Sequence, residues 1–135
     1  MAATFIDNSK IQEALVAYLK SKTTLTSVIT AKEIRENTWK GTDFKYPNVR
    51  VDLVNNKPGK LGCPQDIDVT FQVFSESPSS KQADEIAGII TVILHDKPFQ
   101  QSTLNFSLVA TNVKPAYEVG VNTWRSDVVM SGQVS

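Results

Sequence analysis

Two runs of alternating apolar and polar residues constrain the fold of this chain more than any other feature of its sequence. The apolar members are Val49, Val51 and Leu53 in residues 48–54, and Ile67, Val69, Phe71 and Val73 in residues 66–73. Side chains two residues apart lie on the same face of an extended strand, so each run has one apolar and one polar face. The pattern predicts two half-buried antiparallel strands. Other elements must therefore cover one face of a sheet.

Two amphipathic helices are expected to provide that cover. The first spans about residues 9–21, with Ser9 and Gln12 spaced as in a capping box, and its apolar stripe consists of Ile11, Ala14, Leu15, Tyr18 and Leu19. The second begins after Ser79, which forms a similar pair with Gln82, and its stripe consists of Ala83, Ile86, Ala87, Ile90 and Leu94. Ile89, Val92 and Ile93 make its last two turns apolar nearly all round, so this half is expected to be deeply buried. Pro98 is expected to end the helix.

The remaining segments complete a simple element order. Residues 103–113 and residues from about 123 onward predict two further strands, joined by a polar turn. Residues 23–30 are expected to hold a turn and a short strand, residues 31–47 are polar and irregular, and residues 55–65 form an unusually long loop. The order helix, strand pair, helix, strand pair predicts one α+β domain over residues 1–135. We expect a two-layer sandwich, with a mostly antiparallel sheet of about four to five strands and two amphipathic helices on one face.

Composition excludes several classes of protein. The chain has 135 residues, with 14 Lys and Arg against 14 Asp and Glu, so it lacks the net positive charge typical of nucleic-acid binding. One Cys and one His are too few for a disulfide scaffold or a four-ligand zinc site. The longest apolar cluster, Ile86 to Leu94, is too short to span a bilayer, and the opening residues carry no visible secretion signal. We therefore expect no nucleic-acid or membrane partner.

The charge is nevertheless unevenly distributed along the chain. Residues 1–60 hold 10 basic and 6 acidic residues, a net charge of +4, whereas residues 61–135 hold 4 basic and 8 acidic residues, a net charge of −4. A protomer with charge separated in this way can stack head-to-tail on copies of itself, which favours self-assembly.

A search for catalytic chemistry finds little. His95 is the only imidazole, and its position at the end of the second helix is typical of a capping residue, where a cation opposes the helix dipole. Cys63 lies in a Gly/Pro-rich loop with no His nearby in the sequence. Asp66 and Asp68 point to the same side of one strand, roughly 6.5 Å apart, but this is also how a solvated strand looks. The sequence therefore predicts no catalytic residue, no metal site and no cofactor.

Two tryptophans lie in polar surroundings. Trp39 follows Asn37-Thr38 and Trp124 follows Asn122-Thr123. Either residue can fill the core at the edge of the sheet, or anchor a protein–protein interface, where Trp, Tyr and Arg are over-represented. Both interpretations stay open at this stage.

Four stretches together resemble a known family. They are Ala-Tyr-Leu-Lys at 17–20, Tyr-Pro-Asn-Val-Arg-Val at 46–51, Asp-Val-Thr-Phe-Gln-Val-Phe-Ser-Glu-Ser at 68–77, and the helix Lys-Gln-Ala-Asp-Glu-Ile through Leu-His-Asp-Lys-Pro-Phe at 81–99. In order and spacing, over nearly the full chain, they resemble the tail terminator (tail completion) proteins of long-tailed bacteriophages. The resemblance is one of pattern and size rather than of a single motif.

The resemblance implies a structural function. Such proteins form a hexameric ring on the last ring of tail-tube subunits, stop tube polymerisation and present a surface to the head-closure (neck) protein. It therefore implies a virion protein at the head-proximal end of the tail, assembled in the host cytoplasm, whose partners are itself, the tube protein and the neck protein. The family has no catalytic residues to carry over to this sequence.

Eight residues are the candidates for contacts with a sister subunit or partner. They lie on the polar face of the predicted strands, in the long loop or at the tryptophans: Trp39, Lys57, Lys60, Asp66, Asp68, Gln72, Trp124 and Arg125. Two other functions remain open. One is a head-closure or adaptor protein of the same neck, and the other is a small hydrolase that uses the Asp66/Asp68 pair.

Overall fold

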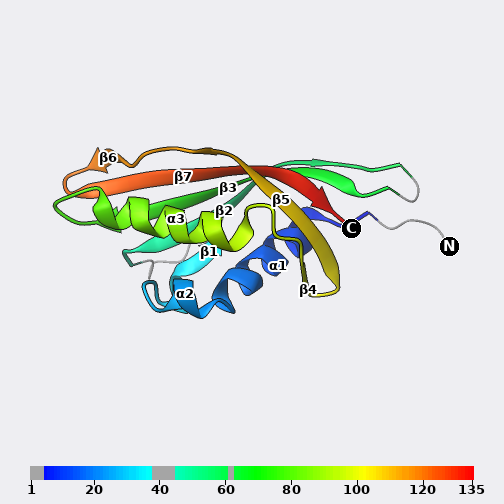
Figure 1. Cartoon of the computed structure of the whole chain (residues 1–135), viewed down its shortest axis with the longest axis horizontal. Helices are drawn as coiled ribbons and strands as arrows, with labels where there is room; N and C mark the ends of the chain where they lie inside the picture. Colours follow the sequence, from blue (N-terminus) through cyan, green and yellow to red (C-terminus); the bar gives the residue numbers. More distant parts are fainter. Residues whose placement is uncertain (1–4, 38–44, 61–62) are drawn as a thin grey trace.

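The computed structural model describes residues 5–37, 45–60 and 63–135. Its elements are α1 (Asn8–Lys20), α2 (Thr23–Thr26), a 3₁₀ turn (Ala31–Glu33), β1 (Ile34–Glu36), β2 (Asn48–Lys57), β3 (Gln65–Glu76), α3 (Lys81–Leu94), β4 (Phe99–Gln101), β5 (Leu104–Val113), β6 (Tyr117–Gly120) and β7 (Thr123–Val134). The helices lie together on one side of a long, twisted sheet (Figure 1). None of these helices has the length and hydropathy to cross a membrane within the described ranges.

The sheet is built around its two longest strands, β3 and β7. The strand order is β1-β2-β3-β7-β5-β4, and β6 pairs with the beginning of β7, beyond the end of β5. All pairings between these strands are antiparallel except that of β1 with β2. The α+β class, the mostly antiparallel sheet and the helices on one face are thus confirmed.

Within the part of the chain that the structure describes, the sheet nevertheless has seven strands, not the four to five expected. The additional strands β1, β4 and β6 have three, three and four residues. A strand of this length is too short to show an alternating pattern, so the sequence carries no signal for it.

The predicted inward side chains form the core. Those of β2 and β3 that are fully or almost fully buried are Val49, Val51, Ile67, Val69, Phe71 and Val73. Leu53 is only partly buried, because the pairing of β2 with β3 shifts by one residue between Leu53 and Asn55. The helices bury Ile11, Leu15 and Leu19 from α1, and Ala83, Ile86, Ile90 and Leu94 from α3.

Both capping-box predictions are wrong in detail. Helix α1 begins one residue earlier than expected, with Asp7 as its N-cap, and the Asp7 carboxylate accepts a hydrogen bond from the backbone N–H of Lys10 at 2.9 Å. Ser9 therefore lies inside the helix. Helix α3 begins at Lys81, and its N-cap, Ser80, makes no capping bond through its side chain.

Pro98 does not end α3. The helix ends at Leu94, because His95 already has an extended backbone and Asp96 adopts a left-handed conformation with φ of 54°. A left-handed residue directly after a helix breaks the repeating geometry on which the next intrahelical bond depends. Pro98 lies after the end of the helix, in the segment that leads into β4, where a proline is tolerated.

The segments between α1 and β2 were also predicted incorrectly. Residues 23–26 form the short helix α2 instead of a strand, and a strand, β1, appears within residues 31–47 where irregular structure was expected. The loop between β2 and β3 is shorter than predicted, because β2 continues to Lys57. The hairpin of β2 and β3 therefore projects as an arm beyond the helices, at the same end of the molecule as the C-terminus (Figure 1).

Candidate interaction surfaces

The open face of the sheet carries a compact polar cluster around Phe74. The guanidinium groups of Arg50 and Arg125 lie 5.2 and 5.6 Å from the centre of the Phe74 ring, within the range of cation–π attraction. Arg125 also donates two hydrogen bonds, of 2.8 and 3.2 Å, to the carboxylate of Asp127, two residues along β7. The hydrogen bonds to Asp127 raise the pKa of Arg125 above its usual value.

Gln72 belongs to the same face but is almost covered. Only 8% of the residue is exposed, and its side-chain amide donates a long hydrogen bond of 3.4 Å to the carboxylate of Asp52. Asp127 is similarly covered, at 5% exposure. Arg50 and Arg125 are partly exposed on this part of the sheet, and arginine is a residue type enriched at interface hot spots.

The aspartate pair lies nearer the arm, in a shallow depression. Asp68 accepts hydrogen bonds from the hydroxyl of Ser131 at 2.6 Å and from the side-chain amide of Asn55 at 3.0 Å. These bonds, the one from Ser131 first, lower the pKa of Asp68 below its usual value. Asp66 accepts a weaker bond, of 3.3 Å, from Gln133. A general acid needs a raised pKa, so the surroundings of Asp68 do not suit it to that role.

Trp124 and Arg125 follow one another on β7 and so point to opposite faces of the sheet. The indole of Trp124 is partly buried against the core, and its N–H donates to the carbonyl oxygen of Ser77 at 3.0 Å. This placement agrees with core filling at the edge of the sheet. Trp39 lies outside the described residues.

The arm presents Lys57 and Lys60 as exposed side chains, and its base is tied to the N-terminal segment. The side-chain amide of Gln65 accepts a hydrogen bond from the backbone N–H of Ile6 at 2.7 Å and donates to its carbonyl oxygen at 3.1 Å. Asn56 accepts a further bond from Gln65 and donates to both Ile6 and Asn8. These bonds hold the base of the arm against the start of α1.

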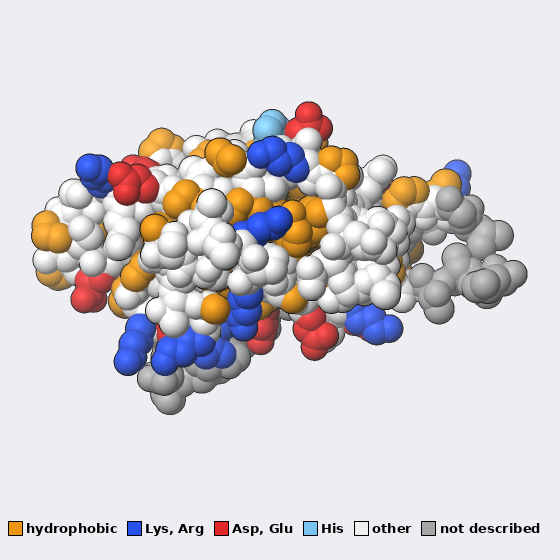
Figure 2. Space-filling model, turned by 60° about the horizontal axis from the view of Figure 1, so that its bottom comes forward, with side chains coloured by type: hydrophobic (Ala, Val, Ile, Leu, Met, Phe, Trp, Pro, Cys, Tyr) orange, Lys and Arg blue, Asp and Glu red, His pale blue; other side chains and the backbone are white. Residues whose placement is uncertain are grey.

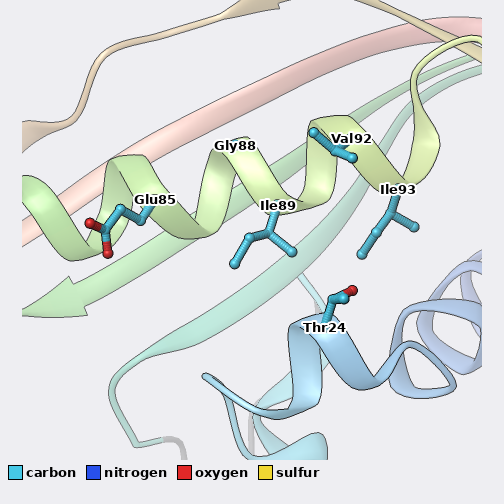
Figure 3. Close-up of a pocket in the computed structure, with 6 residues that line it drawn as sticks. All are labelled: Thr24, Glu85, Gly88, Ile89, Val92 and Ile93. Atoms are coloured by element: carbon cyan, nitrogen blue, oxygen red, sulfur yellow. The ribbon is translucent and has the colours of Figure 1, made fainter.

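The second half of α3 is less buried than predicted, and this leaves an apolar groove. Val92 is 66% exposed, and Ile89 and Ile93 are only partly buried. A groove of about 580 Å³ runs between α3 and α2, lined by Thr24, Glu85, Gly88, Ile89, Val92 and Ile93. Figure 3 shows Ile89 and Ile93 pointing from α3 toward Thr24 on α2. We call this the α2–α3 groove.

A second apolar surface lies at the turn between β6 and β7. Val121 is 90% exposed, and Tyr117 and Val119 on β6 are about half exposed, at 44% and 47%. The turn lies at the end of the long axis opposite the arm (Figure 1). We call these residues, 117–122, the β6–β7 tip. Neither the groove nor the tip was singled out from the sequence.

His95 and Cys63 occupy the surface, as expected. The Nδ1 atom of His95 accepts a hydrogen bond of 2.9 Å from the backbone N–H of Ala110. It thus ties the end of α3 to β5. Cys63 is exposed at the arm. Within residues 5–37, 45–60 and 63–135, no three His, Cys, Asp or Glu side chains gather as a metal site would require.

Comparison with known proteins identifies a similar fold. A chain of a solved structure, described as "Virion of native gene transfer agent (GTA) particle", matches with a TM-score of 0.71, over 92% of this chain and 93% of that one. The sequence identity is 18%, so the likeness is one of fold. No protein-family model matches the chain. No curated protein sequence matches it either.

Proposed function

We propose that this chain is a structural subunit of a phage-like virion, and that it acts as the tail terminator. In that role, copies of the chain form a ring on the last ring of the tail tube, stop further polymerisation and offer a surface to the head-closure protein. The function requires no reactive pocket, only surfaces that fit sister copies and the end of a tube.

The observation that carries the proposal is the fold match. Two chains of nearly equal length, each covered by more than nine-tenths, share one architecture, and the other chain is part of a virion. The uncovered apolar groove and tip add support, because isolated exposed apolar side chains are common but grouped ones mark interaction sites. The resemblance to tail terminators in sequence pattern supplies the finer assignment.

Mixing the purified chain with growing tail-tube protein tests the proposal. We expect tubes capped at one end in negative-stain images, and a shorter mean tube length as the ratio of chain to tube protein rises. A chain with the Val121→Asp substitution serves for comparison, because Val121 is too exposed for its loss to affect folding. Unchanged tube lengths, together with binding to portal–capsid complexes, would instead identify a head-closure or adaptor protein.

A further inference from the structure

We infer that the β6–β7 tip of one copy docks in the α2–α3 groove of the next copy. This inference rests on the proposed function, which requires the chain to assemble with itself. It adds to that function the contact by which neighbouring subunits recognise one another.

The two surfaces match in polarity. The groove is walled by Ile89, Val92 and Ile93, and Gly88 leaves its floor open, because a side chain there would meet no atom within 4 Å. The tip carries Tyr117, Val119 and Val121 in a convex turn. A narrow apolar turn entering an apolar groove would remove both surfaces from water at once, which is the main driving force of association.

The charges around the two surfaces are complementary. Lys97 donates a hydrogen bond to the carbonyl oxygen of Val92 at 2.6 Å, so its ammonium lies at one end of the groove. The tip is flanked by Glu118, on β6, and by Glu76, which pairs with Thr123 where β7 begins, while Arg125, opposite Tyr117, is already paired with Asp127. Both carboxylates are exposed.

Glu85 is the acidic residue in the groove itself. It lies 3.9 Å from Lys81, so this pair brings little net charge to the contact. Figure 2 shows apolar side chains on this face of the molecule, with lysine or arginine side chains and some acidic side chains among and below them. An acidic, apolar tip is therefore the occupant that the groove fits best.

The occupant is a second copy because the contact cannot form within one chain. The tip lies at one end of the long axis, beyond the N-terminal end of α3, whereas the groove runs along the helical layer (Figure 1). Two different surfaces of the same chain that complement each other give a heterologous contact. Repetition of such a contact closes a ring or extends a filament.

A charge-exchange experiment tests the contact. The variant Lys97→Glu reverses the charge at the end of the groove that Lys97 occupies, and the variant Glu76→Lys with Glu118→Lys reverses the flanks of the tip. Each variant alone would place like charges in contact, so we expect weaker self-association than in the wild-type chain by sedimentation velocity. An equimolar mixture should recover it, because tips and grooves of opposite charge then alternate.

The reversal of Lys57 and Lys60 on the arm is the matched control and should leave self-association unchanged. Recovery in the mixture also shows that both variants are folded. The inference is overturned if either variant assembles as well as the wild-type chain, if the mixture does not recover, or if the wild-type chain stays monomeric up to its solubility limit.

Thiol cross-linking gives an independent readout. In a Cys63→Ser background, Val92→Cys and Val121→Cys place one thiol at the groove and one at the tip. A short bismaleimide should convert the doubly substituted chain into a ladder beyond the dimer, while each singly substituted chain gives no ladder. If no ladder forms although the chain still caps tubes, this contact is wrong and the proposed function stands. If a ladder forms but the chain does not cap tubes, the contact is right and the proposed function is wrong.

Discussion

At the scale of single residues, Gly132 shows how closely the strands approach one another. A Cβ atom at this position would lie within 3 Å of backbone atoms of Ser107 and Leu108 on β5. Since the obstructing atoms belong to the backbone, the two strands would have to separate. We expect Gly132→Ala to lower the free energy of unfolding by about 1–3 kcal/mol, the usual cost of overpacking. Urea denaturation measures this loss, and a variant as stable as the wild-type chain would contradict the close approach.

Asp68 provides a prediction of pH dependence. Its pKa is lowered in the folded chain, first by the hydrogen bond from Ser131, so this group adds stability above the usual carboxyl range and loses it as the pH falls through the lowered pKa. Ser131→Ala removes that hydrogen bond. Because the site is solvent-exposed, we expect a loss of only about 0.5 kcal/mol at neutral pH, and none in strong acid.

The measurement is urea denaturation of the Ser131→Ala variant at neutral and acidic pH, with NMR titration of the Asp68 carboxyl. Ser107→Ala is the control, because Ser107 lines the same depression but is not among the residues that shift the pKa of Asp68. An unchanged titration of Asp68 in the Ser131→Ala variant would contradict the assignment.

At the scale of elements, a glycine-to-alanine substitution in α3 should have the opposite effect and stabilise the chain. Gly88 lies in the middle of the helix, and a Cβ atom there would meet nothing within 4 Å. Alanine loses less backbone entropy than glycine on forming a helix, so Gly88→Ala should raise the free energy of unfolding by about 0.5–1 kcal/mol. The same denaturation assay measures it. A destabilised variant would mean that the floor of the groove is already occupied in the isolated chain.

The long elements could be predicted from the sequence and the short ones could not. The alternation around Val51 and Phe71 identifies β2 and β3, because a buried face imposes period two over many residues. Strands of three or four residues are too short to show this period in the sequence. They form because β2, β5 and β7 offer unpaired edges. Helix ends also depend on local competition, as when Asp7 caps α1 ahead of Ser9.

The period-two pattern predicts that Asp68, Gln72 and Arg125 lie on one face of the sheet, and they lie on its open face, although neighbouring side chains leave Gln72 almost covered. For Trp124 the sequence left core filling and an interface anchor both open, and the indole lies partly against the core. The position of the α2–α3 groove could not be predicted, because it depends on where α2 packs. The sequence did indicate uncovered apolar surface on α3, because the end of this helix is apolar nearly all round and one sheet can cover only one side of it.

At the scale of the whole molecule, the groove, the tip, the open face of the sheet and the arm lie in different places and can bind different partners. The groove and the tip would be used between sister copies, which leaves the open face of the sheet and the arm for other virion proteins. The arm lies at the end of the long axis opposite the tip (Figure 1). Its base is fixed by Gln65 and Asn56, so Lys57 and Lys60 are held on a preorganised support, which lowers the entropy cost of binding.

We therefore predict that Lys57→Ala with Lys60→Ala weakens binding to tail tubes and leaves self-association intact. Two exposed lysines at a rim contribute about 1 kcal/mol together, so the expected loss in affinity is about threefold to tenfold, and it should shrink as salt is added. Co-sedimentation with purified tubes at low and high salt measures the loss. Lys10→Ala with Lys20→Ala, two exposed lysines on α1, is the matched control. Equal losses in the two double variants would mean that tube binding depends on total charge and not on the arm. Loss of both self-association and tube binding in the arm variant would instead mean that the arm takes part in the contact between copies.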